Sequence, residues 1–236
     1  MFYAIQDADD ISYPHRIERQ VQCMLENPAL AAVFTGYDLI LNGRRLAPQF
    51  AGKDIQECRE DIEQMHLPAT DATGMFRKAM VSKICYEPTL KIGQGYDHIL
   101  RVGERYPMMV LGECLYSVRY HYDSTTRRDW ILRRKMLKEV WERAYQRRGL
   151  DMNEHYSPKP RQVATLLYRK QEHGIVPHFM QSVLDLRRAG QFGQAMNTAF
   201  ACLRLHPCDP YYYKPLAYLV VPMVAIQCYR SRTKGK

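Results

Sequence analysis

The sequence lacks an apolar run long enough to cross a lipid bilayer. Its longest such run, from Pro215 to Cys228, holds about 14 residues, whereas a membrane-spanning helix needs about 20. The first residues also lack the basic segment followed by an apolar core that marks a secretory signal. These absences lead us to expect a cytoplasmic protein.

Paired cysteines are missing as well. The seven cysteines are an odd number, they are widely spaced, and no two of them form a Cys-x-x-Cys pair. Such spacing suggests neither a disulfide framework nor a zinc knuckle. A reducing compartment agrees with this cysteine content.

Acidic residues are in the minority, with 25 Asp and Glu against 34 Lys and Arg, which gives a net charge of +9. A basic protein favours anionic partners such as nucleotides, nucleic acids or acidic lipid surfaces. No recognised fingerprint accompanies the basic residues, so nucleic acid is the disfavoured partner. Two alternatives stay open for the apolar run and the basic tail at 229–236. They form either a buried terminal helix with a solvated end or a peripheral contact with anionic lipid at the inner face of the membrane.

Three carboxylates crowd into four positions near the start of the chain, at Asp7, Asp9 and Asp10. They follow Met1 to Ile5, which we expect to form a short buried strand. Like charges this close repel one another unless a cation lies among them or solvent surrounds them. The cluster is therefore either a cation site or a solvated loop that caps the next helix.

The periodicity of apolar residues predicts an alternation of helices and strands up to about residue 128. We expect helices at 14–26, 54–65, 79–84 and 96–104, and strands at 31–41 and 110–120, the second interrupted by Gly112-Glu113. A turn is expected at Asn42-Gly43. A polar, glycine-containing loop at 67–74 precedes the apolar pair Met75-Phe76. Ligands of open α/β sheets bind at the carboxyl ends of strands, which is where the acidic cluster lies.

From residue 129 the pattern becomes helical. A long helix is expected from Asp129 to Arg148, with one apolar face and one basic face. The apolar face carries Trp130, Leu137, Val140, Trp141 and Ala144, and the basic face carries Arg127, Arg128, Arg133, Arg134, Lys135, Lys138, Arg143, Arg147 and Arg148. A solvated face and a phosphate-contacting face are both open for the basic side. Beyond a linker at 157–160, segments 187–195 and 205–210 resemble one tetratricopeptide hairpin. We therefore expect two regions, 1–128 and an α-helical extension at 129–236.

Several segments within residues 1–128 together resemble family 2 glycosyltransferases of the A-type fold. The segments are Asp7-Ala8-Asp9-Asp10 after the first strand, Pro14-x-Arg16-Ile17-Glu18-x-Gln20, Met75-Phe76-Arg77-Lys78, Gly93 to Arg101, and Tyr116 to Ser124. The resemblance lies in their shared order and spacing. It implies an α/β fold, a partial A-type glycosyltransferase with a Rossmann-like mixed sheet, followed by the helical extension.

The resemblance also implies roles for individual residues. Asp7 and Asp9 match the Asp-x-Asp motif that holds Mg²⁺ or Mn²⁺ against the two phosphates of a nucleotide-sugar, with Asp7 also toward the nucleoside. His121, in Arg119-Tyr120-His121-x-x-Ser124, matches a late histidine near the metal and the diphosphate, and Arg119 is a candidate substrate contact. Gly74 matches a glycine beside the donor sugar. Structural alternatives stay open for His121, a lone histidine, and for Gly74, an ordinary turn glycine.

The sequence departs from the family pattern in two places. The Glu-Asp pair that supplies the general base in inverting members is Gln94-Gly95 here. Asp97, two residues on, is the candidate substitute, and its alternative role is to orient the helix. Members also begin with a further βαβ unit that carries the nucleoside site. We therefore expect a chain truncated at that unit, with an open edge on its sheet.

The resulting expectation is an inverting glycosyltransferase. It would transfer a sugar from a metal-bound nucleotide-diphosphate sugar to the hydroxyl of a glycan or lipid-linked acceptor, in glycan or cell-envelope polysaccharide synthesis. Two rivals remain. The chain is alternatively a truncated or catalytically inactive remnant of such an enzyme, or a helical interaction module built on residues 129–236.

Overall fold

The computed structural model describes residues 1–41, 43–47, 52–120, 130–150 and 175–222. The chain divides into two compact units, residues 1–166 and residues 167–236. Each unit is described below by itself.

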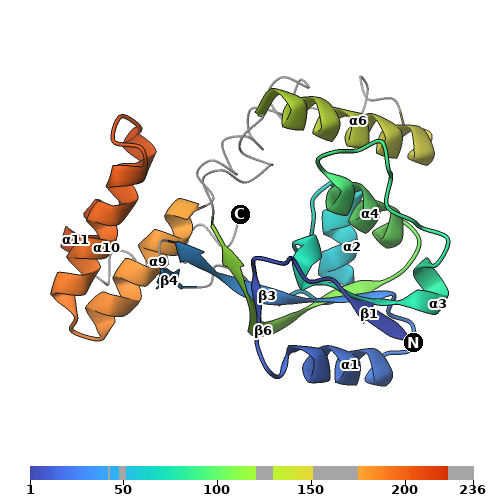
Figure 1. Ribbon diagram of the computed structural model, residues 1–236, viewed down its shortest axis with the longest axis horizontal. Helices are drawn as coiled ribbons and strands as arrows, with labels where there is room; N and C mark the ends of the chain where they lie inside the picture. The colour runs from blue at the N-terminus through green and yellow to red at the C-terminus, as the bar shows by residue number, and fades with distance from the viewer. Residues whose placement is uncertain (42, 48–51, 121–129, 151–174, 223–236) are drawn as a thin grey trace. The chain divides into compact units, whose positions relative to one another are not determined.

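Unit 1 is built on a mixed sheet of six strands (Figure 1). The strands are β1 (Phe2–Ala4), β2 (Ile11–Ser12), β3 (Ala32–Leu41), β4 (Arg44–Leu46), β5 (Met75–Arg77) and β6 (Met108–Arg119). Their order is β1-β5-β3-β6-β2, with β4 pairing with β3. The long central strands β3 and β6 are parallel, and the other pairs are antiparallel. Among the strands described, β1 pairs with β5 alone and forms one edge of the sheet.

Helices cover both faces of this sheet, which makes unit 1 an α/β structure (Figure 1). The helices are α1 (Arg16–Glu26), α2 (Ile55–Glu63), η1 (Asp71–Thr73), α3 (Lys78–Val81), α4 (Gln94–Gly103) and α6 (Trp130–Arg148). Helix α1 packs on one face through Cys23 and Met24, against Val33 and Met75 of the sheet. Helices α2, α4 and α6 lie on the other face, over a larger core that includes Phe76.

Helix α6 belongs to unit 1. Its residues Met136, Val140, Ala144 and Tyr145 are buried in the same core as those of α2 and α4. The expected apolar face is confirmed for Val140, Trp141 and Ala144, which are all buried. The side chain of Trp130 is not among those described. The expected boundary at 128/129 therefore differs from the observed division, because α6 covers the first unit.

Unit 2 consists of α9 (Ile175–Arg188), α10 (Phe192–Leu205), η2 (Pro210–Tyr213) and α11 (Lys214–Val220). Gly190, at a φ of 71°, turns the chain between α9 and α10, a conformation that favours glycine. Val183, Ala195, Ala199 and Leu219 bring the three helices together in one small core. The helical character expected for this region is confirmed, and its likeness to a tetratricopeptide hairpin stays a prediction.

Most expected elements are found with shifted ends. The predicted helix at 79–84 is the short α3. Strand β6 runs on through Gly112-Glu113, but its pairing with β3 is irregular there, because Phe34 pairs with Val110 and Gly36 pairs with Cys114. Asn42 of the expected turn, the linker at 157–160 and the basic tail lie outside the described residues. Within the described ranges, no helix is long and apolar enough to span a membrane.

Candidate active site

The acidic cluster lies in the loop between β1 and β2, at the carboxyl end of β1. Two contacts fix this loop to β6. The backbone N–H of Asp7 donates to the hydroxyl of Tyr116 at 3.1 Å, and Asp10 accepts a hydrogen bond of 2.8 Å from the backbone N–H of Arg119. Asp10 is thus used in holding the loop, whereas Asp7 and Asp9 are exposed.

A buried arginine joins the acidic loop to the loop at 71–74. The guanidinium of Arg16 donates to the carbonyls of Ile5 at 2.8 Å and Ala72 at 3.0 Å, and lies over the Tyr116 ring. One turn later Gln20, also buried, donates to the carbonyls of Val33 and Thr73. These two side chains of α1 satisfy backbone groups that would otherwise be buried without partners. They fix the two loops beside each other at the end of the sheet.

The carboxylates in the acidic loop repel one another. Partial burial, with the negative charge of Asp9 beside it, raises the pKa of Asp7. Nearby cations offset such repulsion. Among the residues described, no three acidic, histidine or cysteine side chains converge as metal ligands. Mg²⁺ bound with a nucleotide usually takes only one or two carboxylates, with phosphates and water completing the shell. The pair Asp7 and Asp9 fits that donor set.

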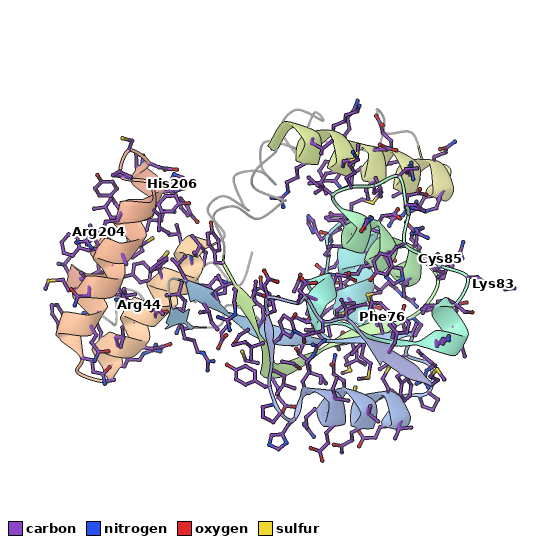
Figure 2. The ribbon with its side chains drawn as sticks, in the orientation of Figure 1. Arg44, Phe76, Lys83, Cys85, Arg204 and His206 are labelled. Carbon is purple, nitrogen blue, oxygen red and sulfur yellow. The ribbon has the colours of Figure 1, made fainter. Side chains whose placement is uncertain are left out.

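The other candidates from the motif have different surroundings. Arg119 is exposed at the end of β6, beside the acidic loop. His121 lies outside the described residues. Gly74 is buried, and a Cβ there would lie 2.7 Å from the ring of Phe76 and 2.9 Å from that of Phe34. Because aromatic rings fill the space next to it, packing explains Gly74 without a sugar. Figure 2 shows Phe76 on the sheet beneath α4.

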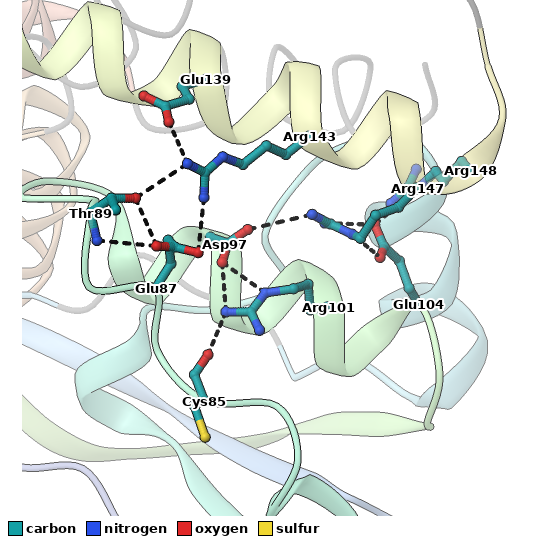
Figure 3. A network of polar contacts seen from close by, with 10 residues as sticks. All are labelled: Cys85, Glu87, Thr89, Asp97, Arg101, Glu104, Glu139, Arg143, Arg147 and Arg148. Atoms are coloured by element: carbon teal, nitrogen blue, oxygen red, sulfur yellow. Dashed lines mark hydrogen bonds and ion pairs between the residues drawn. The ribbon is translucent and has the colours of Figure 1, made fainter.

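Asp97 is held by arginines. It is 2% exposed, its carboxylate lies 2.6 Å from the guanidinium of Arg101, and Arg147 of α6 lies 3.6 Å from its other oxygen (Figure 3). Arg101 in turn donates to the carbonyl of Cys85. Both oxygens of the Asp97 carboxylate are thus engaged by arginines. This environment favours the structural alternative, in which Asp97 orients α4 and docks α6.

The basic face of α6 is partly neutralised within unit 1. Arg143 pairs with Glu87 at 3.0 Å, and Arg147 and Arg148 each pair with Glu104 at 3.0 Å (Figure 3). Arg148 also donates to the carbonyl of Ile62. Acidic residues of unit 1 thus hold these three arginines. Their partners lie in the unit that α6 covers, which the helical periodicity alone could not reveal.

One carboxylate at the site was not among the sequence candidates. Asp71 opens η1, and the hydroxyl of Tyr86 donates to its two oxygens at 2.9 and 3.1 Å. Tyr86 stacks on the buried ring of His98, with centroids 4.3 Å apart. Burial raises the pKa of Asp71 to about 6; the Tyr86 hydrogen bond opposes this rise, and the charge of Asp7 adds to it. The negative charge of Asp7 therefore contributes to the raised pKa of Asp71. The polar loop before Met75-Phe76 was the only signal for Asp71 in the sequence.

A cleft of about 790 Å³ lies at the opposite end of α4 from Asp71. Its walls include Cys58 and Ile62 of α2, Gly103 at the end of α4, and Arg148 of α6. A ten-residue helix is about 15 Å long, so this cleft is remote from the carboxylates at the start of α4. It is therefore not part of the candidate site.

The chain was also compared with known proteins. No family model matches it, and the comparison with curated proteins finds no match for it either.

Proposed function

We propose that the protein is an inverting glycosyltransferase of the A-type fold, similar to family 2. It transfers a sugar from a nucleotide-diphosphate sugar to an acceptor hydroxyl. The observation that carries the proposal is the loop that presents Asp7 and Asp9 to solvent at the carboxyl end of β1, fixed by Arg16 and Tyr116. The resemblance of the surrounding motifs supports the choice of reaction.

In this proposal the chain's own residues hold and orient the donor. Asp7 and Asp9 bind Mg²⁺ or Mn²⁺, which when present neutralises the charge of the diphosphate leaving group. Arg119 lies at the adjacent strand end and contacts the diphosphate, which suits a planar guanidinium. The α/β architecture agrees with this arrangement, since open sheets bind ligands at strand ends. A glycan or lipid-linked acceptor and a peripheral membrane contact stay predictions.

Metal-dependent donor binding tests the proposal directly. We would measure binding of UDP-glucose, UDP-N-acetylglucosamine and GDP-mannose by calorimetry, with Mn²⁺ and with EDTA. Release of UDP or GDP would be followed in the presence of simple sugar acceptors. Wild-type protein should bind at least one donor with Mn²⁺ only. Asp9→Ala should weaken that binding by at least tenfold, because one of two carboxylate ligands is lost.

Glu60→Gln is the matched control, because Glu60 is an exposed carboxylate on α2, outside the site. It should bind donor as the wild type does. Absence of Mn²⁺-dependent binding to every donor in the wild type would refute the proposal. If Asp9→Ala and Glu60→Gln lose the same amount of donor affinity, the result would also count against the proposal. It would show that donor binding responds to the net charge of the protein and not to Asp9 in particular.

The second candidate function is a non-catalytic donor-binding remnant. It is favoured by one observation, the arginine-paired state of Asp97 next to the Gln94-Gly95 departure. It predicts Mn²⁺-dependent donor binding without release of UDP or GDP. The same calorimetric and release measurements therefore separate it from the transferase.

A further inference from the structure

At the start of α4, the side chain of Asp71 fills the place where the family pattern would put a carboxylate from position 95. Gly95 occupies the position of the expected Asp, and a Cβ built on it would lie 2.6 Å from the Cβ of Asp71. The same point lies 2.8 Å from the Cγ and from the Oδ2 of Asp71. The carboxyl group of Asp71 therefore lies against Gly95, in the space that a side chain at position 95 would enter.

Several contacts hold Asp71 in this place. The backbone after it is fixed by the hydrogen bond from Arg16 to the carbonyl of Ala72, and the N–H of Gly74 closes η1 by donating to the carbonyl of Asp71 at 2.8 Å. Tyr86 donates to the carboxylate from the other side. Neither of its oxygens is paired with an arginine among the described residues, in contrast to Asp97. Asp71 as a residue is half-buried.

We propose that Asp71 is the general base of the transfer reaction, supplied from η1 in place of the missing carboxylate at position 95. This inference rests on the proposed function. As the acceptor oxygen forms its bond to the anomeric carbon, its proton moves to the carboxylate of Asp71. The bond between the anomeric carbon and the phosphate oxygen breaks, and the nucleoside diphosphate leaves with the electron pair.

The surroundings suit this role. A base works best when its pKa lies near the working pH, and burial raises the pKa of Asp71 to about 6. The groups that face it are Tyr86, Tyr3 and Asp7. Two of these are neutral at pH 7, and the third is an acid. The acceptor proton therefore meets a carboxylate whose charge is not compensated by a cation of the described chain.

The geometry provides a specific exchange experiment. Asp71→Asn keeps the size of the side chain and an acceptor for Tyr86 but cannot take a proton. Asp71→Gly removes the carboxylate and opens the space. Adding Gly95→Asp to Asp71→Gly returns a carboxylate to the same space from α4, where the family pattern has it.

We expect Asp71→Asn and Asp71→Gly to lower Mn²⁺-dependent release of UDP or GDP by about 10²- to 10⁴-fold. Donor affinity, measured by calorimetry with the same three nucleotide sugars, should stay within about threefold of wild type, because general-base loss spares donor binding. The exchanged double variant should release nucleotide at least tenfold faster than Asp71→Gly alone. Circular dichroism and the melting temperature show that each variant is folded.

Three results would overturn the proposal. Asp71→Asn could release nucleotide at close to the wild-type rate, or it could lose donor affinity in parallel with release, which is the mark of a structural role. The exchanged variant could be folded and yet no faster than Asp71→Gly. If the wild-type protein binds donor but releases no nucleotide, Asp71 is not a general base, although donor binding stands. If the wild-type protein binds no donor, the proposed function itself is refuted.

Discussion

At the scale of single residues, the site is distinguished by acids in unequal surroundings. Asp97 is buried against two arginines, Asp71 is half-buried beside a tyrosine, and Asp7 is exposed. Pairs of acids with different surroundings are the usual basis for dividing roles at an active site. Here Asp97 is held by arginines, whereas neither Asp7 nor Asp71 is paired with an arginine among the described residues.

The raised pKa of Asp71 has a consequence for stability. The folded pKa of about 6 lies above the usual value of about 3.9 for an unfolded chain. The folded state therefore binds the proton more tightly, and its extra stability is present below pH 4 and lost as the pH rises through 6. Because asparagine does not titrate, the Asp71→Asn variant does not lose this stability as the pH rises. Its free energy of unfolding, relative to wild type, should rise by about 2 kcal/mol between pH 4 and pH 7.

Urea unfolding at a series of pH values measures this difference. His98, whose pKa burial lowers to about 4, titrates in both proteins, so its effect cancels in the comparison. Glu60→Gln serves again as the control for the loss of one exposed carboxylate. A constant offset between Asp71→Asn and wild type would show that the folded protein does not perturb Asp71.

At the scale of elements, one face of helix α1 holds the acidic loop, the η1 loop and strand β3 together through side-chain hydrogen bonds. Arg16 and Gln20 on the buried face bind five backbone carbonyls, those of Ile5, Ala72, Gly74, Val33 and Thr73. Arg19, on the exposed face, pairs with Glu113 at 2.7 Å. Arg16 therefore binds backbone carbonyls on the buried face of α1, whereas Arg19 forms an ion pair on its exposed face.

Arg16→Met and Arg19→Met compare the two directly. Arg16→Met leaves buried carbonyls of Ile5 and Ala72 without this donor, and we expect it to lower the free energy of unfolding by about 3 kcal/mol. Arg19→Met removes an exposed ion pair, which solvent screens, and should lower the free energy of unfolding much less than Arg16→Met does. Urea unfolding at pH 7 measures both. Equal losses would show that the Arg16 contacts do not support the fold.

The elements themselves were largely predictable from the sequence. The apolar period of three to four residues gave α1 and α6, and Asp54 with Glu57 forms the capping box that begins α2 close to its expected start. Such signals are local. Ala72 lies 56 residues from Arg16, and Arg147 lies on a different helix from Asp97, so no local pattern could identify these two contacts. The site residues Asp7 and Asp9 were found because their motif is local, whereas Asp71 is placed by tertiary contacts.

At the scale of the whole molecule, the position of α6 decides where the first unit ends. The contacts of α6 with unit 1 combine a buried apolar face with ion pairs from Arg143, Arg147 and Arg148 to Glu87 and Glu104. Helix α6 therefore belongs with the first unit, whereas residues 167–236 form a compact unit of their own. The interaction module at 129–236 stays a prediction.

Two shortened chains test this assignment. Residues 1–150 keep α6, whereas residues 1–128 end where the sequence pattern first suggested a boundary. Burial of a large apolar side chain contributes about 1.5–3 kcal/mol, and α6 buries Val140, Trp141 and Tyr145 among others. Their sum approaches the whole stability of an ordinary domain, about 5–15 kcal/mol. We expect residues 1–150 to unfold cooperatively in urea. Residues 1–128 should aggregate or bind a hydrophobic dye, because the core over α4 is uncovered. If both chains unfold with the same midpoint and slope, α6 does not contribute to the first unit.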